Sequence, residues 1–274
     1  APALHGPTPA PVMERPTRPG PRPAVIDPRA LPNVGRVTEA ELSGIFTSIG
    51  KLGVPYIFVR GNHDASSPGD QALLQRMARI KNVMLLEPTP QSYTEVTVDG
   101  VVIAGFNDPR FFGDDNTNNA EKQQPAAEAF NKAFADRSRP DIVVSHEPSA
   151  VKMVDSATTL VNGHMHSDEL DGNRIGVGTF TGGGTVSHIV YQQSQAADTG
   201  ELAGQPYAFD IAVFSQSCDL SSLTRYTYRN LIQGRPAYDN VSVINGKTIA
   251  ARESGDRSCS TDLGVGRTTV TLGG

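Results

Sequence analysis

Three short stretches of the chain place histidines directly after runs of apolar residues. His164 and His166 stand in VNGHMHS, His63 in GNHD, and His146 in SHEP. Imidazole nitrogens are ligands for zinc, manganese and iron, and two histidines one residue apart supply two such donors compactly. Loops that follow buried strands are where open α/β sheets hold their functional groups. The first prediction is therefore a metal site built from three loops.

Each stretch has a plainer interpretation when it is taken alone. An isolated HxH is more often a solvated or core pair, and His146 alone is more often structural. The GNHD stretch could be no more than a turn closed by Asn62. An amide oxygen can also ligate a divalent ion, however, and a neighbouring imidazole such as His63 can give or take a proton. Because four of the six histidines follow predicted strands, a shared site is favoured.

The histidine pair has a geometric rationale in the sequence. Side chains alternate along extended backbone, so His164 and His166 are expected to point to the same side. Gly163 allows the chain to turn closely just before them.

In this order and spacing, GNHD, SH and GHxH resemble the last three of the five motifs of the calcineurin-like metallophosphoesterases. The resemblance covers about residues 37–214. It implies an α/β (α+β) fold, a double β-sheet sandwich flanked by helices. It also implies a dinuclear centre of divalent ions (Mn, Fe or Zn) that hydrolyses phosphomonoesters or phosphodiesters of small molecules with a metal-bound hydroxide.

The resemblance also implies roles for individual residues. The metal ligands would be Asn62, His146 and His164 for one ion and His166 for the other. His63 would lie beside the scissile phosphate as a leaving-group acid or charge stabiliser, and Asp64 would orient His63.

Two motifs of that family are absent here, the DxH of its first strand and the GD of its second. Asp27, after the apolar run PAVI, is the one substitute for the bridging carboxylate. With few ligands for the second ion, we expect a mononuclear or weak site and impaired activity. The alternative is a non-catalytic, degenerate metallophosphoesterase-like binding domain. Loss of the N-terminal part by truncation or frameshift would explain the gap, as would true degeneration.

The apolar periodicity predicts alternating helices and strands. Helices are expected over 38–52, 70–80 and 126–135, and strands over 54–60, 83–86, 93–98, 101–106, 142–145, 159–161, 174–180, 186–192, 207–214 and 223–228. Asp99-Gly100 marks a hairpin. Residues 1–35, rich in Pro, Ala and Arg, are expected to be disordered, 36–234 to form the metallophosphoesterase-like domain, and 235–274 to be a β-rich extension of short pieces packed on it.

Four other features are assigned roles outside the predicted metal site. Asp108 is interpreted as a turn-capping residue and Arg110 as a solvated loop arginine. The glycines at 182–184 are interpreted as a flexible connection and His188 as a structural residue of a strand.

Composition limits the partners. The net charge of −5 gives no basic surface for docking nucleic acid, and no apolar run approaches the ~20 residues of a transmembrane helix. A missing first strand would leave a sheet edge unpaired and favour self-association. Cys218 and Cys259 could form a disulfide worth ~4 kcal/mol, which would favour an extracytoplasmic location, or remain two free thiols.

Overall fold

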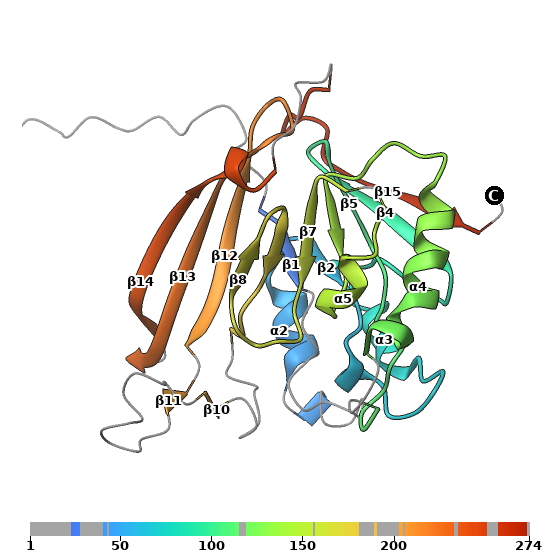
Figure 1. Cartoon of the computed structure of the whole chain (residues 1–274), viewed down its shortest axis with the longest axis horizontal. Helices are drawn as coiled ribbons and strands as arrows, with labels where there is room; N and C mark the ends of the chain where they lie inside the picture. Colours follow the sequence, from blue (N-terminus) through green and yellow to red (C-terminus); the bar gives the residue numbers. More distant parts are fainter. Residues whose placement is uncertain are drawn as a thin grey trace, which may run out of the picture.

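The computed structural model describes residues 23–27, 41–42, 44–114, 119–155, 157–180, 189–190, 203–204, 206–232, 235–250 and 257–272. The described chain is a mixed α/β fold of the general α+β class, with several sheets and few helices (Figure 1). Residues 182–184, His188 and all of 1–35 except 23–27 lie outside the described part, and so do the expectations for them. No helix in the described ranges is long and apolar enough to span a membrane.

The first sheet has three short parallel strands in the order β1-β2-β3. They are β1 (Val25–Asp27), β2 (Tyr56–Phe58) and β3 (Val83–Leu85). Helices α2 (Ile45–Lys51) and α3 (Ala72–Met77) supply Phe46, Leu74 and Met77 to a buried cluster with Tyr56 and Phe58. Every residue of β2 and β3 is buried, which explains why both strands are continuous apolar runs in the sequence.

The second sheet has seven strands in the order β15-β4-β5-β6-β7-β9-β8. They are β15 (Val265–Thr271), β4 (Ser92–Val98), β5 (Val101–Gly105), β6 (Ile142–Val144), β7 (Thr159–Asn162), β9 (Arg174–Gly176) and β8 (Glu169–Asp171). The pairs β5-β6, β6-β7 and β7-β9 are parallel, so the carboxyl ends of these strands lie at one edge. That edge carries two of the three histidine loops.

Helices α4 (Asn119–Phe134) and α5 (Pro148–Val151) lie on one face of the seven-stranded sheet (Figure 1). Phe130 of α4 packs against Phe106 and Tyr93 with ring centroids 5.0 and 5.5 Å apart. The helix begins well before the predicted residue 126 and continues through Pro125. Proline costs the helix one backbone hydrogen bond, and burial of Gln123, Ala127 and the phenylalanines offsets that loss.

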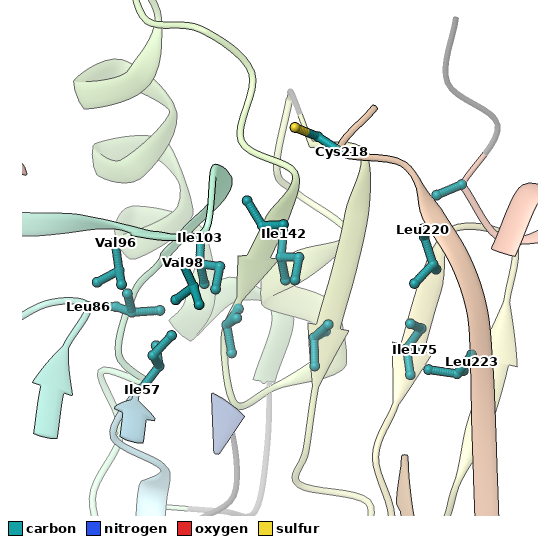
Figure 2. Close-up of a cluster of buried hydrophobic side chains, with 14 of the residues drawn as sticks. Ile57, Leu86, Val96, Val98, Ile103, Ile142, Ile175, Cys218, Leu220 and Leu223 are labelled. Atoms are coloured by element: carbon teal, nitrogen blue, oxygen red, sulfur yellow. The ribbon is translucent and has the colours of Figure 1, made fainter. Parts of the chain in front are cut away.

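The other face of this sheet meets the three-stranded sheet in the main core. Ile57 and Leu86 come from the three-stranded side and face Val98, Ile103 and Ile142 from the seven-stranded side (Figure 2). Burying one such side chain contributes about 1.5–3 kcal/mol. This core therefore holds the two sheets, and the loops that leave them, in fixed relation.

A third sheet is antiparallel and extends the molecule at one end (Figure 1). It contains β12 (Tyr207–Phe214), β13 (Leu220–Ile232) and β14 (Arg235–Asn245). A separate two-stranded sheet pairs β10 (Ile189–Val190) with β11 (Ala203–Gly204). The expectation of only short β pieces after residue 234 is wrong, because β14 has 11 residues. Its mostly exposed side chains give no inward pattern, and pairing with β13 supplies its hydrogen bonds.

Several local predictions can be compared with the structure. The hairpin is confirmed: Val98 pairs with Val101, and Asp99 and Gly100 have φ of 52° and 97°. The disulfide between Cys218 and Cys259 is present. The helix predicted over 38–52 is interrupted: Glu41 and Leu42 are helical, but α2 starts only after Gly44 at φ 71°, and Leu42 is 84% exposed instead of facing inward.

Candidate metal site

Three loops from two facing sheets bring the predicted ligands together. Asn62 opens a 3-10 turn, η1 (Asn62–Asp64), shortly after β2. His146 lies two residues beyond β6, and His164 two residues beyond β7. Because β6 and β7 are parallel neighbours, their following loops are adjacent, and the Gly163 N–H donates to the His146 carbonyl at 3.0 Å.

The three side chains are in direct contact. Nε2 of His146 lies 2.9 Å from Oδ1 of Asn62 and 3.1 Å from Nδ1 of His164. Asn62 and His146 are each 1% exposed, whereas His164 is partly open to solvent. One oxygen and one nitrogen, from residues 84 and 18 positions away in the chain, therefore lie within hydrogen-bond distance of the same nitrogen of His146.

This donor set fits a divalent ion. A single hydrogen on Nε2 of His146 can serve only one of its two neighbours, whereas a cation would satisfy all three atoms in tautomers that leave both nitrogens bare. Two ligands at about 2.1 Å that subtend a right angle, as in octahedral sites, stand about 3.0 Å apart, which is close to both separations. In the described part of the chain, no group of three or more His, Cys, Asp or Glu is arranged to hold a metal. The set reaches three donors because Asn62 adds an amide oxygen.

The GHMH loop is not extended, so the argument from strand alternation is wrong for the histidine pair. His164 and His166 both have left-handed backbone, with φ of 66° and 57°. Such conformations are uncommon outside glycine and cluster at functional sites. The Thr179 N–H donates to the His166 carbonyl at 3.2 Å, which fastens the loop to the chain beyond β9. Ligation of a second ion by His166 stays a prediction.

The GNHD loop is closed by its own carboxylate. Oδ2 of Asp64 accepts the Gly61 N–H at 2.7 Å, and the Asp64 N–H donates to the Gly61 carbonyl at 3.2 Å. The ring of His63 is half-buried and packs edge-on against Phe112, with centroids 5.2 Å apart. Asp64 thus shapes the turn that presents Asn62, and its predicted orientation of His63 stays a prediction.

Asp27 ends β1 and is buried. It stands in register with Phe58 of β2, at the end of the sheet from which the GNHD loop leaves. Its Oδ2 accepts a hydrogen bond from the Tyr56 hydroxyl. The carboxylate is therefore engaged with the three-stranded sheet, and its use as a bridging ligand stays a prediction.

A buried charged network behind the histidines was missed by sequence reasoning. Nε2 of His164 lies 3.2 Å from Oε2 of Glu147, and Nη2 of Arg110 donates to the same oxygen at 2.8 Å. Arg110 also pairs with Asp108 at 2.6 Å. The interpretation of Arg110 as a solvated arginine is wrong, because it is only 1% exposed. Asp108 does cap its turn, accepting the Arg110 N–H at 2.9 Å, and it also carries this ion pair.

The surroundings favour the charged forms of Asp108 and Arg110. Burial alone would raise the pKa of Asp108, but hydrogen bonds from Arg110 and Gln123 and the charge of Arg110 hold it below the ordinary value. Burial would lower the pKa of Arg110, and its bonds to Asp108 and Glu147 raise it instead. The network is therefore a fixed charge arrangement directly behind His164.

A second arginine fastens the GNHD loop to the same region. The Arg60 N–H donates to Oδ1 of Asn107 at 2.8 Å, and its Nε donates to the Asp108 carbonyl at 3.2 Å. Its Nη1 donates to the Asp70 carbonyl at 3.0 Å. Arg60 therefore joins the loops that follow β2 and β5. The sequence signal for these contacts was slight, since FNDPR contains ordinary turn residues.

No known protein family matches the chain, and no curated protein matches it.

Proposed function

We propose that the protein is a metal-dependent phosphoester hydrolase of the metallophosphoesterase type, acting on phosphomonoesters or phosphodiesters of small molecules. The observation that carries this proposal is the convergence of Asn62, His146 and His164, with donor atoms 2.9 and 3.1 Å apart. These are the residues that the GNHD, SH and GHxH motifs assign to one metal ion.

The layers around the site support the same proposal. Two sheets pack face to face through one core, α2 and α3 cover the outer side of one sheet, and α4 and α5 cover the outer side of the other. This order of layers is what a double β-sheet sandwich flanked by helices requires.

The residues around the donors have complementary chemistry. A bound divalent ion would polarise a phosphoryl oxygen and acidify a coordinated water. Asn62, His146 and His164 would hold it, and the half-buried His63 is exposed enough to meet a substrate and pass a proton to its leaving group. His166 is the candidate ligand for a second ion. The absent DxH and GD motifs predict a low rate.

A non-catalytic metal-binding relative is the second candidate. Its support is the composition of the donor set, which brings together two imidazoles and one amide. The buried disulfide between Cys218 and Cys259 fits an extracytoplasmic location for either candidate.

Hydrolysis of a nitrophenyl phosphodiester with added Mn²⁺ tests the proposal against the alternative. We expect turnover by the wild-type protein, with Mn²⁺ bound by mass spectrometry. We expect His164→Ala to lose both, because it removes one of three donors. Glu169→Gln, on the exposed strand β8, serves as the control and should match the wild type. Turnover no higher than that of His164→Ala would sink the enzyme proposal, and retained Mn²⁺ would then favour the second candidate.

A further inference from the structure

The contacts of His164 define which nitrogen carries its proton. Nδ1 faces His146 Nε2 at 3.1 Å, and Nε2 faces the Glu147 carboxylate at 3.2 Å. A neutral imidazole has one N–H, and an ionised carboxylate can only accept. The proton is therefore favoured on Nε2, because the other tautomer would place a nitrogen lone pair against a carboxylate oxygen. Nδ1 is then left bare and directed at the Asn62 and His146 donors.

Glu147 is itself held from behind. Its Oε2 accepts from Nη2 of Arg110 at 2.8 Å, and Arg110 is anchored by Asp108, which is fully buried. Asp108 in turn accepts from Gln123 of α4 at 2.8 Å. The carboxylate that faces His164 is thus fixed in position by Arg110 and by the groups that anchor Arg110.

We propose that Glu147 is a positioning residue that keeps the His164 proton on Nε2, and that Arg110 holds Glu147 in place for this purpose. The proposal rests on the metal site of the proposed function and names the group that prepares it. Carboxylates that accept from a ligating histidine orient the ring and typically raise metal affinity 10–100-fold.

Two substitutions of equal length separate this role from a merely structural one. Glu147→Gln keeps an oxygen that can accept from both Arg110 and His164, and its amide can face Ser149, whose hydroxyl lies 3.3 Å from Oε1 of Glu147. Glu147→Met keeps the size but lacks a strong acceptor. Glu169→Gln and Glu169→Met are the matched controls, because Glu169 also pairs with a buried arginine, Arg174, but away from the histidines.

The decisive readout is the tautomer of His164 in metal-free protein, from nitrogen-15 NMR of histidine-labelled samples with assignment by His164→Ala. We expect the Nε2–H form in the wild type and in Glu147→Gln, and its loss in Glu147→Met. Mn²⁺ titration calorimetry should show affinity about 10–100-fold weaker for Glu147→Met and less than about 10-fold weaker for Glu147→Gln. The Glu169 variants should match the wild type in both measurements.

An Nδ1–H tautomer in the wild type, or an unchanged tautomer in Glu147→Met, would overturn the role of Glu147. If Glu147→Met does not fold, the tautomers of His164 in the wild type and in Glu147→Gln test the role of Glu147. Failure of the wild type to bind Mn²⁺ would contradict the proposed function. The positioning role would still stand in that case if the Nε2–H form depended on the acceptor at position 147.

Discussion

Two buried arginines hold the two sides of the GHMH loop, and they do so in different ways. Arg110 reaches the loop through Glu147, which contacts His164. Arg225 of β13 reaches it through Asp168, two residues after His166, at 3.2 Å. Both guanidinium groups sit against carboxylates, and in both cases these partners raise the arginine pKa against the lowering effect of burial.

The difference lies in what stands beyond each carboxylate. Arg225 also donates to the carbonyls of Glu169 and Gly176 and pairs with Asp210 at 2.8 Å. Its bonds join β13 to β12, β8 and β9, and they end on backbone carbonyls and on the carboxylates of Asp168 and Asp210. The bonds of Arg110 end on a carboxylate that has a histidine as its next neighbour. Two buried guanidinium groups of the same charge therefore differ in role: Arg225 ties strands together, whereas Arg110 fixes a carboxylate that contacts a histidine.

The largest effect is expected from Arg110→Met. It leaves the carboxylates of Asp108 and Glu147 buried without their cation, which costs about 3–5 kcal/mol of unfolding free energy. Mn²⁺ affinity should also fall about 10-fold or more, since Glu147 loses its anchor. Urea unfolding and titration calorimetry measure the two losses. Arg110→Lys should lie between the wild type and Arg110→Met in both measurements. Wild-type Mn²⁺ affinity in a folded Arg110 variant would show that the network stabilises the fold without preparing the metal site.

Arg225→Met should destabilise the fold without touching the donors. We expect a loss near the lower end, about 3 kcal/mol, because only Asp210 is left buried without its cation, whereas Asp168 is partly open to water that can replace the arginine. Mn²⁺ affinity should stay within about threefold of the wild type, since none of the bonds of Arg225 leads to His164. A fall in Mn²⁺ affinity as large as that of Arg110→Met would contradict the different roles given to the two arginines.

The smallest effect on stability is expected from Glu169→Gln, a substitution on the exposed strand β8. A hydrogen bond from Arg174 is the main cause that lowers the pKa of Glu169 below its ordinary value of 4.5. The ion pair is half-exposed, so solvent screening limits it to about 1 kcal/mol or less. Its contribution is present above pH 4.5 and is lost as the pH falls through the lowered pKa. Urea unfolding at neutral and acid pH should show the difference from the wild type shrinking in acid.

Much of the scaffold could be predicted from local patterns. The buried strands β2, β3 and β6 are uninterrupted apolar runs, and Asp99-Gly100 specifies its hairpin because both residues must adopt positive φ. The start of α4 and the length of β14 were missed. In both cases tertiary partners supply what the sequence pattern lacks, through burial around Pro125 and pairing with β13.

The candidate site divides in the same way. The sequence by itself determined the donor types, since GNHD, SHEP and GHMH each place a candidate ligand after a strand. Only the tertiary structure decided that Asn62, His146 and His164 meet, that the GHMH loop has left-handed backbone, and that Arg110 is buried beside Glu147. The physical reason is that each residue carries its own side-chain chemistry, whereas burial and charge pairing depend on segments far apart in the chain.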